Sequence, residues 1–118
     1  MFLFQRKIFI INQPRFNKKD GVGMQGVSRL GDNCSGHSCF PPRINTSASF
    51  NVFVNGRGWH RYGDTWENHC CGIYCHGGVL DDGSNSVFVN GKRAGRVGDS
   101  ISCGSVIVNG STNVFAGD

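Results

Sequence analysis

Two short segments of the chain carry the same pattern of hydrophobic and polar residues, an apolar Val-Phe-Val followed by Asn-Gly. Residues 52–56 and 87–91 both read V-F-V-N-G, and four residues after each segment the chain reads R-x-G-D. Apolar side chains that alternate with a period of two predict a β-strand, and Asn-Gly favours a two-residue turn with positive φ at both positions. Each copy therefore predicts a β-hairpin followed by a turn.

Half copies of the same unit stand at the two ends of this region. Residues 29–32 read R-L-G-D without a preceding V-F-V-N-G, and residues 114–117 read V-F-A-G without a following R-x-G-D. If the C-terminal strand pairs with the N-terminal strand, the two halves complete a third unit and leave no unpaired sheet edge. The pattern predicts an all-β fold with pseudo-threefold repeats and few or no helices.

The composition agrees with a turn-rich β protein. Glycine accounts for 18 of 118 residues, charged residues for 17% and hydrophobic residues for 38%. These values exclude a coiled coil and a highly charged disordered chain. The longest apolar stretch, residues 7–11, is far shorter than the roughly 20 residues that span a bilayer.

The net charge of +4 is concentrated in the N-terminal segment. Residues 1–23 carry five basic side chains and one acidic side chain, whereas residues 24–118 carry seven of each. A body without net positive charge is a poor electrostatic match for nucleic acid. Residues 1–4 are apolar and the basic residues follow, the reverse of a secretory signal. We expect residues 1–23 to be a loose extension or to precede the true start, and residues 24–118 to form the domain.

Two histidines and one cysteine fall at related positions of the repeat. His37 and His69 each follow the aspartate of an R-x-G-D by five residues, and Cys103 follows one by four. Equivalent side chains of three units around one axis converge, and His76 is the natural fourth ligand, with Cys75 as the alternative. Three histidines and a cysteine are a workable tetrahedral set for zinc, and iron is the second choice. Four protein ligands leave no position for an activated water, which predicts a structural metal.

Three R-x-G-D units interleaved with V-F-V-N-G strands, Gly-Ser turns and Cys103-Gly104 resemble the PAAR-repeat family over residues 26–118. Within it the chain is most similar to the small single-domain tip proteins of contractile phage tails. The resemblance implies a sharp conical β-prism with a metal near its tip, bound by three histidines and one cysteine that match His37, His69, His76 and Cys103. It also implies a membrane-piercing cap on a trimeric β-helical spike, one copy per trimer, related to type VI secretion spike tips.

The remaining chemistry-bearing residues receive structural interpretations. The repeated arginines and aspartates of R-x-G-D are expected to cap turns and bridge strands, and no enzyme motif is present, so we predict no catalysis. Cys34 and Cys39 flank His37, but nothing completes a second metal set. Assembly in a bacterial cytoplasm predicts that the cysteines other than Cys103 are reduced thiols.

The place of the large side chains in the repeat indicates where they pack. Phe53, Phe88 and Phe115 are repeat-equivalent and are predicted to pack in the core or between strands. Trp59 and Trp66 are expected to cover the sides of the prism. His60 has no equivalent in the other units and is expected to be an ordinary polar residue.

Two other functions compete with the spike tip. A free-standing zinc-binding interaction module, of the nucleic-acid type, is the alternative, and the neutral charge of residues 24–118 argues against it. A zinc hydrolase would need an open coordination position. The spike-tip hypothesis places the chain in the virion, at the tail baseplate, with the target envelope membrane as a transient contact and no nucleic-acid partner.

Overall fold

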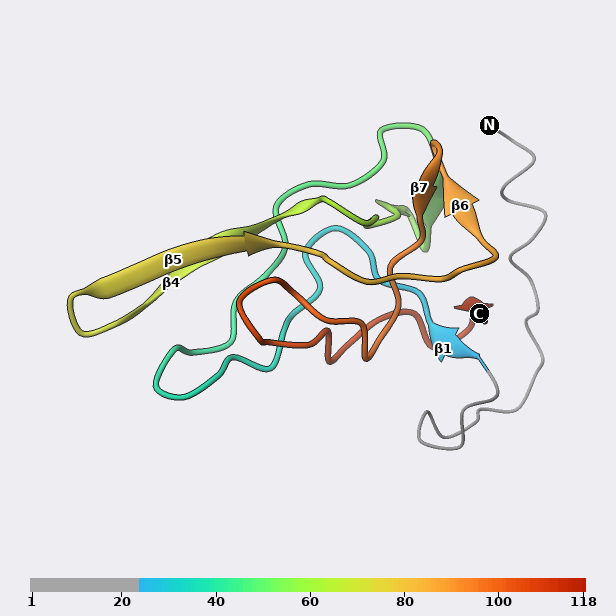
Figure 1. Ribbon diagram of the computed structural model, residues 1–118. Helices are drawn as coiled ribbons and strands as arrows, with labels where there is room; N and C mark the ends of the chain where they lie inside the picture. Colours follow the sequence, from blue (N-terminus) through green and yellow to red (C-terminus); the bar gives the residue numbers. More distant parts are fainter. Residues whose placement is uncertain (1–23) are drawn as a thin grey trace.

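The computed structural model describes residues 24–118, and these residues form short antiparallel β-strands and turns with no helix among them (Figure 1). The predicted extension, residues 1–23, lies outside the described residues. The all-β prediction is confirmed for the described part of the chain. The strands are β1 (Gln25–Gly26), β2 (Phe53–Val54), β3 (Arg57–Gly58), β4 (Thr65–Cys71), β5 (Tyr74–Val79), β6 (Phe88–Val89), β7 (Lys92–Arg93) and β8 (Phe115–Ala116).

Both V-F-V-N-G segments form the predicted hairpins. Strand β2 pairs with β3, and β6 pairs with β7, in the same antiparallel register. Asn55 and Asn90 have φ of 55° and 56°, and the glycines that follow them have φ of 80° and 78°. Positive φ at both central residues is the conformation that the Asn-Gly sequence favours, because its twist matches that of the strands.

The two half copies at the ends of the domain pair to form a third two-stranded antiparallel unit, equivalent to the two hairpins. Strand β1 pairs with β8, so that Gly26 stands opposite Phe115. The corresponding pairs in the other units are Gly58 with Phe53 and Arg93 with Phe88. The predicted pairing of the N-terminal and C-terminal strands of the domain is therefore present.

The three R-x-G-D segments are turns of the same construction. In each one the aspartate accepts hydrogen bonds from the backbone N–H and the guanidinium of its own arginine, and the glycine has φ between 86° and 95°. Only glycine adopts this backbone conformation without steric cost. Isolated β-bridges connect the three turns pairwise. They join Arg29 with Trp59, Arg61 with Ala94 and Arg96 with Val27.

The valines of the hairpins, and not the phenylalanines, form the core. Val52, Val54, Val87 and Val89 are at most 5% exposed, whereas Phe53 and Phe88 are 55% and 37% exposed. The prediction that the repeat-equivalent phenylalanines pack in the core is wrong for these two. Alternate residues of a strand point to opposite faces, and the two valines of each V-F-V segment share the inner face.

The tryptophans and His60 lie deeper than expected. Trp59 is fully buried in a cluster with the hairpin valines, and Trp66 is 4% exposed in a second cluster that includes Leu80 and Ile101. His60 is fully buried with Nδ1 2.8 Å from the Ser47 carbonyl oxygen. All three residues therefore belong to the interior. The prediction that Trp59 and Trp66 cover the sides of the prism is wrong.

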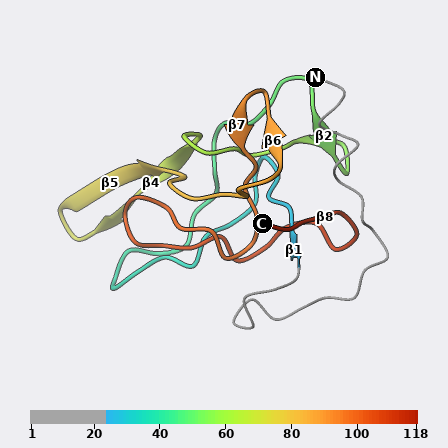
Figure 2. The same cartoon turned by 45° about the vertical axis from the view of Figure 1, so that its right-hand side comes forward.

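The longest hairpin, formed by β4 and β5, projects from the rest of the molecule. Figures 1 and 2 both show it extending away from the three short hairpins. Its register changes between Trp66 and His69, and beyond this irregularity His69 pairs with His76 and Cys70 with Cys75. The hairpin thus carries two of the predicted metal ligands on opposing strands.

Candidate metal centre

The four predicted ligands come from three separate segments of the chain. His69 lies on β4 and His76 directly opposite on β5. His37 lies in a tight loop that is closed by two backbone hydrogen bonds with Phe40, of 3.0 and 2.8 Å. Cys103 lies in the turn between Ile101 and Ser105. Tertiary structure, and not sequence proximity, therefore brings the four side chains together.

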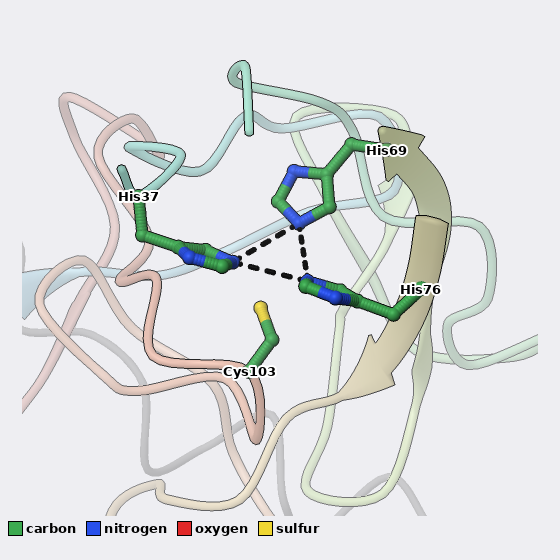
Figure 3. A group of neighbouring side chains, drawn as sticks. All are labelled: His37, His69, His76 and Cys103. Carbon is green, nitrogen blue, oxygen red and sulfur yellow. Dashed lines mark hydrogen bonds between the residues drawn. The ribbon is translucent and has the colours of Figure 1, made fainter. Parts of the chain in front are cut away.

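The ligand atoms converge on one point (Figure 3). The Nε2 atoms of the three histidines form a triangle with sides of 3.2 Å from His37 to His69, 3.0 Å from His37 to His76 and 2.8 Å from His69 to His76. The Cys103 sulfur points toward this histidine triangle, and the four ligand atoms all lie within 4.8 Å of one another. Metal–nitrogen distances near 2.0 to 2.1 Å place ligand nitrogens roughly 3.3 Å apart around a tetrahedral ion, close to the observed sides.

The histidine triangle is better suited to a cation than to hydrogen bonds alone. His69 Nδ1 lies 2.8 Å from the Pro41 carbonyl oxygen, which can only accept, so Nδ1 carries the proton and Nε2 presents its lone pair. Each Nε2 offers either one hydrogen or one lone pair, so with an unprotonated His69 Nε2 at least one of the three contacts joins two N–H groups or two lone pairs. Three lone pairs aimed at one cation remove this conflict, so the residues present fit a metal ion.

The surroundings of His37 and His76 favour the neutral imidazole that a metal requires. Desolvation lowers the pKa of His37, and repulsion from His69 and Arg43 lowers it further. Desolvation likewise lowers the pKa of His76, with added repulsion from His69, His37 and Arg43. Neutral imidazole is the form that binds metal, so the site is prepared to bind a cation at neutral pH.

Phe40 covers the histidines of the cluster. Its ring centroid lies 4.8 Å from that of His37, 4.4 Å from that of His76 and 5.0 Å from that of His69. Such contacts hold the rings in fixed orientations and reduce their access to water. No sequence pattern points to Phe40, because it lies outside the repeat.

The other four cysteines beside the site form disulfides. Cys39 pairs with Cys71, and Cys70 pairs with Cys75. The expectation of reduced thiols is wrong for these four, and Cys75 cannot replace His76 as a ligand while it is paired. Cys75 stands opposite Cys70 in the β4–β5 register, which brings the two sulfurs together. Among the described residues, Cys34 and Cys103 are the free cysteines.

Two residues that the sequence did not single out as partners of the site lie beside Cys103. Arg43 is 5% exposed and directs its guanidinium to the sulfurs of Cys34 and Cys103, at 3.1 and 3.5 Å. Burial raises the pKa of the Cys34 thiol, but hydrogen bonds with Arg43, Gly36 and Ser105 together outweigh burial and leave that pKa below its ordinary value. Arg43 belongs to no R-x-G-D unit, so no spacing pattern pointed to it.

Comparison with known proteins identifies a family for the C-terminal part of the chain. Residues 72–118 match the family model described as the PAAR motif. A stretch of 75 residues is 37% identical to the "NAD(P)(+) glycohydrolase toxin Tse6" of Pseudomonas aeruginosa strain PAO1, covering 58% of this chain and 17% of that protein. The "(p)ppApp synthetase toxin Tas1" of strain UCBPP-PA14 shows the same identity and coverage. The chain thus spans about a sixth of the length of these curated relatives. Residues 24–118 contain no helix that is long and apolar enough to cross a membrane.

Proposed function

We propose that this chain, a PAAR-motif protein through residues 72–118, is the metal-stabilised tip of the central spike of a contractile tail or a related type VI secretion machine. The PAAR motif is a structural spike-tip module. The observation that carries the proposal is the convergence of three imidazole nitrogens and one sulfur from three chain segments. A rigid point is what a device that pierces a membrane by force requires.

The metal-binding part of the proposal assigns one zinc ion, with iron as the second choice, to His37, His69, His76 and Cys103. These donors fill a tetrahedral shell, so the chemistry that the ion supplies is cross-linking and not activation of water. A narrow tip cannot bury a large apolar core, and small scaffolds compensate with metals and disulfides. The two disulfides lie directly beside the histidines, so the disulfides and the proposed metal would cross-link the same part of the molecule.

The partner part of the proposal is a trimeric β-helical spike, capped by one copy of this chain. The three repeat-equivalent hairpins lie at the end of the molecule away from the β4–β5 hairpin (Figure 2). Their outer faces carry the phenylalanines that the core does not use, Phe53 at 55% and Phe88 at 37% exposure. Three similar strands and aromatic positions match a threefold partner, and strand addition needs no sequence identity.

No reaction is assigned to the chain. The repeated arginines and aspartates are engaged with each other inside the R-x-G-D turns. The activities in the names of the two relatives are those of proteins that this chain matches over 17% of their length. We place the chain in the virion or an equivalent tail particle, assembled in a bacterial cytoplasm, with the target envelope as a transient contact.

Two measurements on the full chain test this proposal. Metal analysis of protein purified without added metal is expected to give about one ion per chain. Coexpression with the trimeric spike protein of the same tail is expected to give a complex of one tip and three spike chains by native mass spectrometry. A chain that carries no metal, or that leaves the spike uncapped, contradicts the proposal. Salt-sensitive binding of residues 24–118 to DNA or RNA would favour the nucleic-acid module instead.

A further inference from the structure

The side chain of Arg43 occupies the interior beside the proposed metal centre. In addition to the two sulfurs, its Nε donates to the Glu67 carbonyl oxygen at 2.7 Å and its Nη2 donates to the Gly77 carbonyl oxygen at 3.1 Å. Glu67 lies on β4 and Gly77 on β5. One guanidinium therefore joins the two strands that carry His69 and His76 to the turn that carries Cys103.

Arg43 differs from the three arginines of the R-x-G-D turns, whose side chains are at most 14% exposed. Arg29, Arg61 and Arg96 each pair with the aspartate three residues later, at 2.8 to 3.0 Å. Within residues 24–118, no carboxylate lies within 4.0 Å of the Arg43 guanidinium. A guanidinium stays charged in proteins, and a buried charge without a counterion is costly.

The groups that face Arg43 are the two free sulfurs and the Trp66 ring. The ring centroid lies 5.6 Å from the guanidinium carbon, within the range of a cation–π contact. A cysteine that binds metal does so as a thiolate, and a thiolate is the anion that this cation lacks. Outer-sphere hydrogen bonds to a ligand of this kind fix its orientation and tune its bond to the metal.

We propose that Arg43 is the positioning residue of the metal centre, holding the Cys103 sulfur toward the histidine triangle while it fixes the spacing of β4 and β5. This inference rests on the metal site of the proposed function. Arg43 is not itself a ligand, because a guanidinium offers no lone pair. Its planar fork spreads five N–H donors over three nitrogens and so reaches carbonyl and sulfur acceptors on separate segments, whereas a lysine has its three donors on one nitrogen.

Cobalt titration of the full chain tests the role of Arg43. Co²⁺ takes nitrogen and sulfur sites of the zinc type and, when bound to a thiolate, gives a sulfur-to-cobalt charge-transfer band. Wild-type protein is expected to bind one Co²⁺ with this band, and Cys103→Ser is expected to lose it. Arg43→Gln is expected to weaken Co²⁺ binding by about 10-fold to 100-fold and to weaken or shift the band. Arg43→Lys is expected to lie between wild type and Arg43→Gln.

Arg61→Gln is the matched control, because the Arg61 side chain is only 12% exposed but pairs with Asp64 away from the sulfurs. It is expected to lower thermal stability while the cobalt band and affinity stay within twofold of wild type. If Arg43→Gln fails to fold, Arg43→Lys, which keeps the charge, carries the test. An unchanged band and affinity in the folded Arg43 variant overturn the positioning role alone. A wild-type chain that shows no such band overturns the metal site and the positioning role together.

Discussion

His69 and His76 stand opposite each other across the β4–β5 hairpin, with their Nε2 atoms 2.8 Å apart. Seven residues separate them along the chain, and the turn at Gly72 folds the second back onto the first. This cross-strand pair supplies half of the proposed ligand set from one local element. His37 and Cys103 complete the set only when the long-range fold has formed.

Removing a histidine of the pair is expected to remove the metal and lower stability together. His69→Ala leaves three donors and breaks the contact with the Pro41 carbonyl. A structural zinc contributes on the order of 10 kcal/mol in small peptides, and losing even about 2 kcal/mol lowers the Tm of a domain this size by roughly 8 to 16 °C. Metal content and Tm of the same samples check this, with Cys103→Ala as the second variant. Unchanged metal content in either variant would show that the ligand is misassigned.

The two disulfides are expected to differ in their contribution to stability. Cys39 and Cys71 are 32 residues apart and Cys70 and Cys75 are five apart. In the chain-entropy model these separations correspond to about 4 and 2 kcal/mol. Thermal melts of Cys39→Ser/Cys71→Ser and Cys70→Ser/Cys75→Ser check the order, with Cys34→Ser as the control that breaks no bridge. Alkylation of all six cysteines in unfolded but unreduced protein would refute both bridges.

Burial is expected to decide how much an Arg–Asp pair contributes to the free energy of unfolding. Arg96 and Asp99 have side chains 4% and 0% exposed, whereas Arg93 and Asp82 have side chains 32% and 43% exposed. Arg96→Gln leaves a buried carboxylate without its partner, which costs roughly 3 to 5 kcal/mol. Arg93→Gln is expected to cost less than about 1 kcal/mol. Urea unfolding of the two variants gives both values, and equal costs would contradict the structural role of the R-x-G-D pairs.

His60 is expected to make the fold sensitive to acid. Burial lowers the pKa of His60 to about 4. The hydrogen bond to the Ser47 carbonyl and the charge of Asp64 raise this pKa but do not outweigh burial. The charge of Arg61 lowers it and that of Asp32 raises it. The folded state therefore keeps His60 neutral while the unfolded chain takes up a proton below pH 6.5. Its contribution is present above pH 6.5 and is lost as the pH falls toward 4.

The loss at pH 5 amounts to about 2 kcal/mol relative to pH 7. Because acid also releases metal from histidines, the measurement is a comparison of wild type with His60→Asn at both pH values. The difference between the two proteins is expected to shrink by that amount on going to pH 5. A difference that does not change with pH would mean that His60 is not held neutral.

The sequence was informative where the repeat imposed a local conformation. The V-F-V-N-G and R-x-G-D segments predicted the hairpins and turns because Asn-Gly and the turn glycine restrict the backbone directly. The similar offsets of His37, His69 and Cys103 from their aspartates predicted that these side chains converge, because equivalent positions of three units around one axis face each other. The pairing of the two half copies followed from the absence of a partner strand in each.

The sequence was uninformative where contacts depend on distant segments. The V-F-V pattern alone does not say which face of a hairpin is inner, so it does not show that Phe53 and Phe88 lie on the outer face. Arg43 and Phe40 lie in an irregular loop, so their contacts with Cys103 and with the histidines follow from tertiary packing. The disulfide partners Cys39 and Cys71 likewise belong to different segments.

The hairpin shared between β1 and β8 also affects how the molecule is made. During translation the residues of β1 leave the ribosome about 90 residues before their partner strand β8. The β2–β3, β4–β5 and β6–β7 hairpins can each form as soon as they are synthesised, because their contacts are local. The unit that begins at residue 25 stays open until residue 116 is free, so its completion follows the formation of the three local hairpins.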